Sequence, residues 1–281
     1  MTVALSRYTT LGTGGPAREL AQPTTVAEVE ALLRRREPVA VVGLGSNLLV
    51  ADDGVDRIVL HLEGELSQIE LDGTTVRAGG GAANAVVLHR VRTAGLGGFE
   101  FACAIPGTIG GGVWMNAGAY SSDFSGVLTR ALVATADGTG WLTPQELGLS
   151  YRHSDLVHGQ VVVAAELELR PRPSDEIKAE VRELNATRKA AQPTNRRTFG
   201  SVFKNPEHEL TAGRMLEACG LKGHRIGGAQ ISPKHANFIE NAGDARTEDA
   251  LALMREAIRR AREQFGVELQ HEVEFLGDIA L

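Results

Sequence analysis

Glycine is the feature of this 281-residue chain that most constrains its fold, because its 33 glycines gather in a few short clusters. The main clusters read GTGG, VVGLGSN, RAGGGAANA and IPGTIGGGVWMNAGA. Glycine has no Cβ, so it can turn with a positive φ or let the backbone approach another group closely. We therefore expect the clusters to mark tight turns or places where the backbone contacts a ligand, and not a flexible linker.

Hydrophobic periodicity predicts several helices separated by short strands. Thr25 and Glu28 form a capping box in front of an apolar helical stripe. Further helices are expected over residues 83–94, 174–191 and 247–265, the last of them ending before a glycine. Runs such as RIVLHL and QVVVAAELEL are typical of strands, and VELQHEVEFLGDI alternates like a final strand. The irregular order of these elements favours an α+β fold over a barrel of repeated units.

The length and composition suggest three lobes, over residues 1–75, 76–173 and 174–281. The chain is 43% hydrophobic and 23% charged, and its formal charge of -6 provides no basic field for nucleic acid. No secretory signal and no apolar run of about 20 residues is visible, so we expect a cytoplasmic protein with no membrane partner. No obligate protein partner is evident.

The potential metal ligands show no metal-binding pattern. Cys103 and Cys219 lack C-x-x-C spacing, and the eight histidines show no ligand spacing. Neither a disulfide framework nor a metal site is predicted, and we expect two buried thiols in a reducing compartment.

Two of the glycine clusters could hold a cofactor. VVGLGSN follows a strand but is not G-x-G-x-x-G, and a strand instead of a helix comes after it, so a Rossmann nicotinamide site is disfavoured. A simple hairpin turn is the alternative reading. The second cluster, residues 105–120, could close on the other side of one long phosphate-bearing ligand. The candidate cofactor-binding residues from these two clusters are Gly43, Gly45, Ser46, Asn47, Pro106, Gly107, Thr108, Gly110, Gly111, Asn116 and Gly118.

The stretch FGSVFKNP places Ser201 between Gly200 and an apolar pair. Serine beside glycine is usually turn chemistry. A nucleophilic serine would need a histidine base, and no G-x-S-x-G elbow surrounds this one. The residues around Ser201 therefore do not predict a nucleophile.

Taken in order, the segments GTGGPA, VVGLGSNLLVADDG, AIPGTIGGGVWMNAGAY, YRHSDL, FGSVFKNP and HEVEFLG resemble the UDP-N-acetylenolpyruvoylglucosamine reductase family of flavoenzymes. The resemblance spans residues 13–277. It implies a vanillyl-alcohol-oxidase/PCMH-type FAD-binding unit made of the first two lobes, and a C-terminal α+β substrate-binding lobe. It also implies FAD as cofactor and NADPH as co-substrate. In such a reaction NADPH reduces FAD, and the enolpyruvyl ether of UDP-N-acetylglucosamine then takes a hydride to become UDP-N-acetylmuramate, a peptidoglycan precursor.

The same resemblance assigns catalytic roles to three residues. Ser201 matches the proton donor, which would make it an acid and not a nucleophile. Arg152 in YRHSDL could bind the substrate carboxylate, and it is also a candidate for the cofactor site. Glu272 in HEVEFLG would help only if it is protonated or if it orients another donor, because an ionised carboxylate repels an enolate. Without the resemblance, Arg152 would be read as a surface cation and Glu272 as an exposed strand position.

Four further residues belong to matching blocks. Asn205 matches a residue that contacts the UDP part of the substrate, and Lys204 is either a phosphate-binding cation or a solvated side chain. The roles of His235 and Asn237 in KHANFI stay open.

The chain also departs from the family pattern. No tyrosine lies between residues 152 and 201, so the chain resembles the shorter type that lacks a tyrosine-bearing segment over the substrate. Phe199 and Trp114 stand where relatives commonly carry alanine and arginine, and both could alter contacts with flavin or nucleotide.

Two other functions remain open at this point. Another FAD oxidase or dehydrogenase of the same superfamily would share the glycine clusters but not FGSVFKNP. A non-catalytic flavin- or nucleotide-sugar-binding homologue would be expected to lose Ser201, Arg152 or Glu272, and all three are present.

Overall fold

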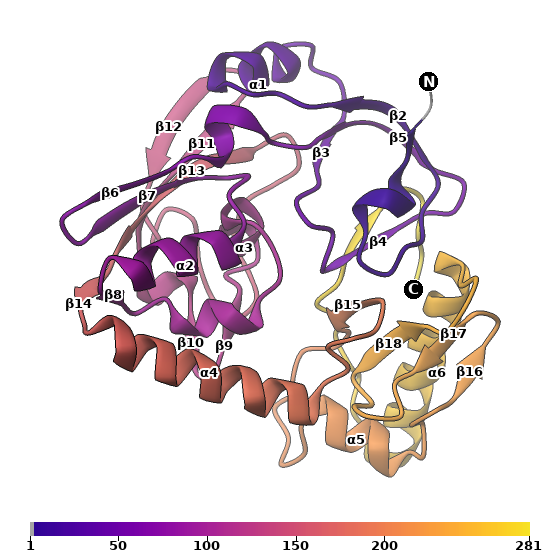
Figure 1. The fold of residues 1–281 in the computed structure, drawn as a ribbon. Coiled ribbons are helices and arrows are strands. Elements are labelled where there is room, and N and C mark those ends of the chain that lie inside the picture. Colours follow the sequence, from indigo (N-terminus) through magenta and orange to yellow (C-terminus); the bar gives the residue numbers. More distant parts are fainter. Residues whose placement is uncertain (1–2) are drawn as a thin grey trace. The chain divides into compact units, whose positions relative to one another are not determined.

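The computed structural model describes residues 3–281, and the chain folds into two compact units (Figure 1). Unit 1 combines the residues up to Arg18 with residues 45–56 and 188–281. Unit 2 combines residues 19–44 and 57–187. Strands β2 (Pro16–Ala21) and β5 (Val55–Leu60) and helix α4 (Ser174–Ala191) carry the chain from one unit to the other. The division into three lobes ending at residues 75 and 173 stays a prediction.

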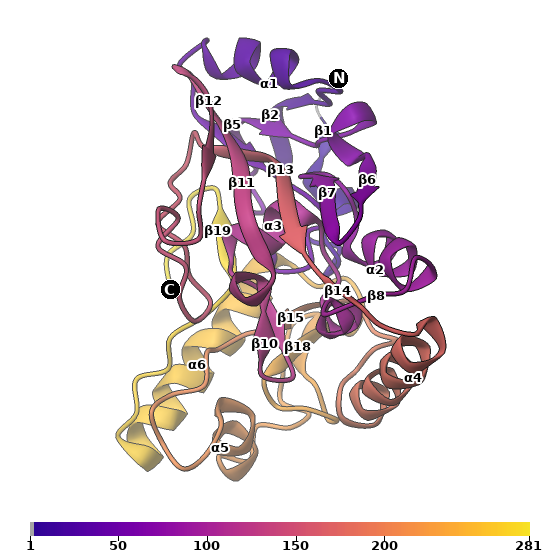
Figure 2. The ribbon, with the colours of Figure 1, turned by 90° about the vertical axis from the view of Figure 1, so that its left-hand side faces the viewer.

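Unit 2 is built on an antiparallel sheet. Within residues 69–168, five strands pair in the order β12-β11-β13-β7-β6. Figure 2 shows β11 and β13 side by side. The five strands are β6 (Ile69–Asp72), β7 (Thr75–Gly79), β11 (Leu128–Thr135), β12 (Gly138–Leu142) and β13 (Val161–Glu168). The remaining elements of this unit are α1 (Val26–Leu33), β3 (Val39–Val41), η2 (Gly64–Ser67), α2 (Asn84–Thr93), β8 (Leu96–Gly97), η3 (Glu100–Ala104), α3 (Ile109–Trp114), β9 (Gly118–Ala119), β10 (Ser122–Asp123), η4 (Phe124–Gly126) and β14 (Arg170–Pro171).

The core of unit 2 contains three buried phenylalanines in edge-to-face contact. The ring of Phe99 lies 5.4 Å from that of Phe101 and 5.6 Å from that of Phe124. Around them, the central strand β13 is buried along most of its length, as its VVVAA sequence leads one to expect. This core supports α2, which follows the glycines of RAGGGAANA, and α3, which itself contains three glycines in the sequence IGGGVW.

Unit 1 contains a smaller antiparallel sheet with the order β15-β18-β17-β16. A separate parallel pair joins β4 to β19 through Leu48 and Glu274. Helix α6 packs Met254, Ala257 and Ala261 into the core, and all three are buried. The elements of this unit are β1 (Val3–Ala4), η1 (Leu5–Tyr8), β4 (Leu48–Val50), β15 (Thr198–Ser201), α5 (Ala212–Ala218), β16 (Arg225–Ile226), β17 (Ala229–Ile231), β18 (Phe238–Asn241), α6 (Thr247–Phe265) and β19 (Glu274–Leu276).

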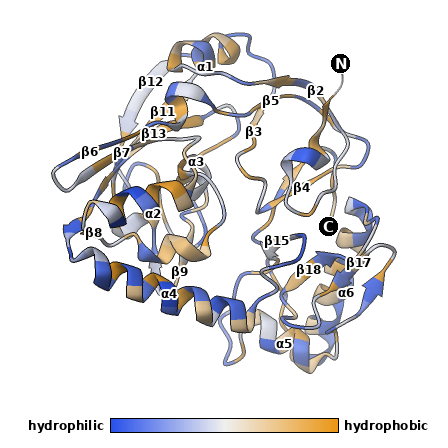
Figure 3. Cartoon of the chain, in the orientation of Figure 1, coloured by the Kyte–Doolittle hydropathy of each residue, from blue (hydrophilic) through white to orange (hydrophobic). Residues whose placement is uncertain are grey.

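The predicted helices are confirmed, and the local signals explain their ends. Thr25 and Glu28 form the expected capping box at the start of α1. The glycine after α6, Gly266, has a φ of 68°, the left-handed conformation that ends a helix without steric cost. Helix α4 spans the expected residues and alternates hydrophilic with hydrophobic positions along its length (Figure 3).

Two sequence-based expectations need correction. The final strand is short: β19 covers residues 274–276, and before it His271 forms only a single bridge with Phe203. Of the two thiols, Cys219 is buried but Cys103 is only half-buried. Burial raises the pKa of the Cys219 thiol.

Within residues 3–281, no helix is long and apolar enough to cross a membrane. Among the same residues, no group of three or more histidine, cysteine or acidic side chains could hold a metal ion.

Candidate active site

Strand β15 carries Ser201 and bends immediately before it. Gly200 has a φ of 86°, and the register between β15 and β18 shifts between Thr198 and Ser201. A Cβ built on Gly200 would lie 3.3 Å from the carbonyl oxygen of Ser46. The glycine therefore supplies a left-handed backbone beside the loop of residues 45–47, and the irregularity turns the half-buried Ser201 relative to the rest of the strand.

The backbone after Ser201 is paired on one side with the segment that contains Glu272. The Glu272 N–H donates to the Val202 carbonyl at 2.9 Å, and the Lys204 N–H donates to the Gln270 carbonyl at 2.8 Å. Two predicted catalytic residues thus lie on adjacent backbone segments of unit 1. Ser201 and Glu272 are far apart in sequence, so local sequence patterns could not predict that their backbone segments pair.

On its other side, the same backbone is held by Asn237. The Val202 N–H donates to the Asn237 carbonyl at 3.0 Å. The Asn237 side chain accepts a hydrogen bond from the Phe203 N–H at 2.9 Å and donates one to the Phe203 carbonyl at 2.8 Å. Asn237 is 5% exposed. Its role was left open by the sequence, and the KHANFI motif was the only signal that marked it.

The loop of the first glycine cluster also contacts the Glu272 segment. The Asn47 side chain donates to the Glu272 carbonyl at 2.8 Å, and the Glu274 N–H donates to the Asn47 carbonyl at 3.0 Å. Asn47 was predicted as a cofactor-binding residue, and that contact stays a prediction. The side-chain nitrogen of Asn47 bonds to the Glu272 backbone, a contact that the sequence did not predict.

The predicted substrate-binding pair follows Ser201 in unit 1. Lys204 is half-buried, whereas Asn205 is exposed and its side-chain oxygen accepts from the Ala212 N–H at 3.2 Å. Ala212 is the first residue of α5. Phe199 is fully buried in the core of unit 1.

In unit 2, three glycine-rich segments meet at the start of α3. The Ile109 N–H donates to the Ala82 carbonyl at 2.9 Å, and the Gly110 N–H donates to the Gly80 carbonyl at 2.8 Å. A Cβ on Gly43 would lie 2.6 Å from the hydroxyl oxygen of Thr108. Glycine is therefore needed at Gly43 for close packing. The RAGGGAANA segment, which sequence analysis did not include among the site candidates, belongs to this group.

Two observations show that these segments fit a bound group. Gly111 is exposed, and a Cβ on it would meet only the Thr108 hydroxyl, at 3.6 Å. The side-chain oxygen of Asn84 is buried and has no hydrogen-bond partner among the described residues. An exposed glycine lets a phosphate approach the backbone, and an unsatisfied acceptor can pair with a donor group, so both features are compatible with a bound cofactor. Pro106 and Gly107 lie in the same segment, and their individual contacts stay predictions.

The loop that carries Arg152 is tied to the segment after α3. The Asn116 side chain donates to the Ser150 carbonyl at 2.9 Å, and the Ser154 hydroxyl donates to the Trp114 carbonyl at 2.6 Å. Asn116 is 1% exposed, and its oxygen also accepts from the Ser125 N–H. The Asn116 side chain is therefore used within the protein, and a cofactor contact through it stays a prediction.

Arg152 itself has a φ of 55°, an uncommon backbone conformation for a side chain of this size. Its guanidinium group donates to the Gly118 carbonyl and lies 5.0 Å from the Tyr151 ring centroid. A Cβ on Gly118 would come within 3.0 Å of the guanidinium. The same Cβ would lie 2.5 Å from the Ser122 carbonyl oxygen and 2.6 Å from the Asp123 Cβ, so glycine at position 118 is needed mainly for its packing against residues 122 and 123.

His235 lies next to the Asn237 contact. Its Nδ1 accepts a hydrogen bond from the Asn237 N–H at 3.2 Å, and its ring packs edge-on against Phe238 at 5.0 Å. Burial lowers the pKa of His235, and the positive charge of Lys222 lowers it further. A neutral ring is the form that can accept this hydrogen bond.

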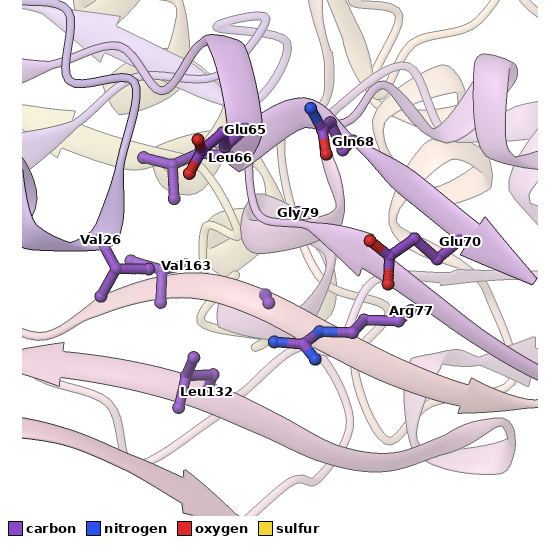
Figure 4. Close-up of a pocket in the computed structure, with 10 residues that line it drawn as sticks. Val26, Glu65, Leu66, Gln68, Glu70, Arg77, Gly79, Leu132 and Val163 are labelled. Atoms are coloured by element: carbon purple, nitrogen blue, oxygen red, sulfur yellow. The ribbon is translucent and has the colours of Figure 1, made fainter.

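Unit 2 also contains a pocket of about 300 Å³ (Figure 4). Leu66, Leu132 and Val163 give it apolar walls, and Glu70 and Arg77 stand at its side. None of the sequence-predicted site residues lines it, although Arg77 and Gly79 belong to the RAGGGAANA segment.

Comparisons with known proteins show which families and structures the chain is similar to. A model of the FAD binding domain family matches residues 17–141, and a model described as UDP-N-acetylenolpyruvoylglucosamine reductase, C-terminal domain, matches residues 192–276. UDP-N-acetylenolpyruvoylglucosamine reductase 2 of Symbiobacterium thermophilum is 44% identical over 280 residues, which cover 97% of this chain and 90% of that protein. The reductase of Bacillus licheniformis is 40% identical over 98% of this chain and 92% of its own length.

Among solved structures, the UDP-N-acetylenolpyruvylglucosamine reductase of Thermus caldophilus superposes with a TM-score of 0.88. It shares 39% sequence identity, and the match covers 98% of each chain. The predicted fold class, an α+β chain with an FAD-binding unit and a C-terminal domain of this reductase type, is confirmed.

Proposed function

The chain belongs to the UDP-N-acetylenolpyruvoylglucosamine reductase family, and from this premise we propose that it reduces the enolpyruvyl ether of UDP-N-acetylglucosamine to UDP-N-acetylmuramate with NADPH. When bound, FAD supplies the hydride-transfer chemistry. The product is a peptidoglycan precursor, and a cytoplasmic location follows from that role. The observation that carries the proposal is the pairing of the Ser201 strand with the Glu272 segment beside the Gly45–Asn47 loop.

Ser201 donates a proton in this proposal. Adding a hydride to the terminal methylene of the enolpyruvyl group leaves negative charge on the α-carbon, next to a carboxylate that is already anionic. Such a carbanion-like centre is basic enough to take the proton of a hydroxyl. The register shift between Thr198 and Ser201 supports this role. Because of it, the half-buried Ser201 side chain does not follow the regular alternation of a strand.

Arg152 binds the carboxylate of the substrate and neutralises the charge that builds there. A guanidinium can make two parallel hydrogen bonds to a carboxylate. Its contact with the Gly118 carbonyl and the hydrogen bonds that tie its loop to Trp114 and Asn116 support the role, because they hold the group in one place.

Glu272 acts in its protonated form or orients another donor, since an ionised carboxylate would repel the enolate. A titration that finds Glu272 ionised in the substrate complex would contradict the first alternative. Lys204 and Asn205 bind the UDP part of the substrate in this proposal.

The test separates the two half-reactions of the FAD-loaded protein. We expect NADPH oxidation that depends on the enolpyruvyl substrate. In Ser201→Ala, NADPH should still reduce the flavin at a near-normal rate, whereas reoxidation by the substrate should slow by about 10²- to 10⁴-fold, as loss of a general acid allows. Ser201→Cys keeps a group with a proton to donate and should lose less.

Two results would contradict the proposal. Oxidation of NADPH that does not respond to the substrate would point to another flavin oxidase, dehydrogenase or binding protein. Equal slowing of both half-reactions in Ser201→Ala would indicate a folding role for Ser201.

A further inference from the structure

The Asn237 side chain completes the pairing between β18 and the backbone that follows Ser201 at the end of β15. The last regular pair between β15 and β18 joins Ser201 to Phe238, and the register is already irregular just before it. Beyond that pair, the two backbone groups of Phe203 face the Asn237 carboxamide. A carboxamide carries one acceptor and a donor, as a peptide group does, so Asn237 extends the sheet by one peptide equivalent.

Burial makes this contact hard to replace. Asn237 is 5% exposed and Phe203 is 2% exposed, so water cannot easily take over either hydrogen bond. A buried backbone group that loses its partner keeps its full desolvation penalty. Leucine or alanine would leave both groups of Phe203 unpaired, and an ionised aspartate would place negative charge against the Phe203 carbonyl.

The same contact reaches both predicted catalytic residues of unit 1. Phe203 is two residues after Ser201, and the intervening Val202 accepts the hydrogen bond from the Glu272 N–H. Displacement of this short segment would move the Ser201 hydroxyl and the Glu272 backbone together. A shift of about 1 Å at a reacting group can cost about 10²-fold in rate.

We propose that Asn237 is the positioning residue for Ser201: its side chain pairs with the backbone of Phe203 and holds the proton donor and the Glu272 segment in register. The inference rests on the proposed role of Ser201 as proton donor. Asn237 touches neither substrate nor cofactor in this account, and acts only through the Ser201–Phe203 backbone.

The main test uses Asn237→Ala and a matched control four residues further along the chain, Asn241→Ala, at the last position of β18. Asn241 is also an asparagine whose side chain bonds to backbone, in its case at Leu11, Gly243 and Ala245. We expect the substrate half-reaction of Asn237→Ala to slow about 10- to 100-fold, with flavin reduction by NADPH within about twofold of normal. Asn241→Ala should leave both rates near normal.

A readout without turnover accompanies the rates. The amide of Phe203 should exchange its hydrogen faster in Asn237→Ala than in the original chain or in Asn241→Ala, because its acceptor is gone. Unchanged exchange at Phe203 would show that the contact does not hold the segment, and would overturn the inference.

A second variant keeps the proposal testable if Asn237→Ala does not fold. In Asn237→Asp, the ionised carboxylate can accept from the Phe203 N–H but has no proton for the Phe203 carbonyl. Burial raises the pKa of a carboxyl group, and once protonated it restores both hydrogen bonds. The substrate half-reaction of this variant, relative to the original chain at each pH, should therefore recover as the pH is lowered.

The outcomes separate this inference from the proposed function. A normal substrate half-reaction in Ser201→Ala would remove the role of Ser201 itself. If the substrate half-reaction were slow in Ser201→Ala but normal in Asn237→Ala, only the positioning role of Asn237 would be overturned. Equal slowing of both half-reactions in Asn237→Ala, or a rate in Asn237→Asp that does not recover at low pH, would assign Asn237 to general stability and overturn it as well.

Discussion

At the scale of single residues, three buried or half-buried asparagines do similar work. Asn237 bonds to the Phe203 backbone, Asn116 to the Ser150 carbonyl, and Asn47 to the Glu272 carbonyl. Each carboxamide thereby contacts the backbone of a segment that carries a predicted catalytic residue. Irregular segments cannot satisfy their own backbone groups, so side-chain amides supply the missing partners.

His235 makes this arrangement sensitive to pH. Its pKa is lowered by burial, and its neutral Nδ1 accepts from the Asn237 N–H. His235 is therefore protonated at a higher pH in the unfolded chain than in the folded chain. The stability contributed by the neutral ring is fully present above the ordinary histidine pKa of about 6.5. It is lost as the pH falls from there through the lowered folded value, with a slope of at most about 1.4 kcal/mol per pH unit.

Urea unfolding at a series of pH values checks this expectation. The free energy of unfolding should fall between about pH 7 and pH 5 more steeply in the original chain than in His235→Gln, which has no titrating ring. The exposed His208, replaced in the same way, is the control. Identical slopes in the original chain and in His235→Gln would contradict a depressed pKa at this position.

At the scale of elements, the N-terminus of the long helix α6 is capped by the carboxylate of Asp52, a residue far away in sequence. Asp52 accepts hydrogen bonds from the Thr247 N–H at 3.0 Å and the Glu248 N–H at 3.1 Å. The Thr247 hydroxyl in turn donates to the Val50 carbonyl at 2.6 Å. The first turn of α6 is thus joined to the end of β4, and the negative charge of Asp52 favours the positive end of the helix.

Replacing this cap should destabilise the protein without changing its chemistry. We expect Asp52→Ala to lower the free energy of unfolding by about 1–2 kcal/mol, the usual effect of losing an N-terminal cap. Asp52→Asn keeps one acceptor oxygen and should lose less. Chemical denaturation measures both, with the exposed neighbour Asp53→Ala as the control. A loss in Asp53→Ala as large as in Asp52→Ala would show that the charge of this turn matters and not the cap.

At the scale of the whole molecule, FAD should bind only the folded chain, because its predicted contacts come from segments far apart in sequence. Any ligand that binds only the folded state stabilises it by mass action, by about 2.7 kcal/mol when its free concentration is 100 times the Kd. Removing FAD should therefore lower the Tm by an amount on the order of 5 °C at that concentration.

Thermal scans of the FAD-stripped protein with added FAD measure this effect. The Tm should rise with FAD concentration, and FMN, which lacks the adenylate half, should raise it less at equal concentration. A Tm that does not respond to FAD would contradict the predicted cofactor-binding residues. If FAD and FMN raised the Tm equally, the glycine segments would not bind the adenylate half of FAD.

The sequence by itself determined the helices and the family. The capping box at Thr25 and the stop at Gly266 are local signals between residues a few positions apart, and they appear where they were expected. The ordered motifs identified the reductase family, and with it the candidates Ser201, Arg152 and Glu272. Such signals need no knowledge of how distant segments meet.

Only the tertiary structure decided what holds those candidates in place. The contacts of Asn237 with Phe203, of Asn47 with Glu272 and of Asp52 with Thr247 join residues 34, 225 and 195 positions apart. An asparagine or aspartate in a loop can bond to any nearby backbone group, so its residue type does not reveal its partner. The partner depends on which segments the packed cores bring within about 3 Å, and this distance is set by the fold and not by the local sequence.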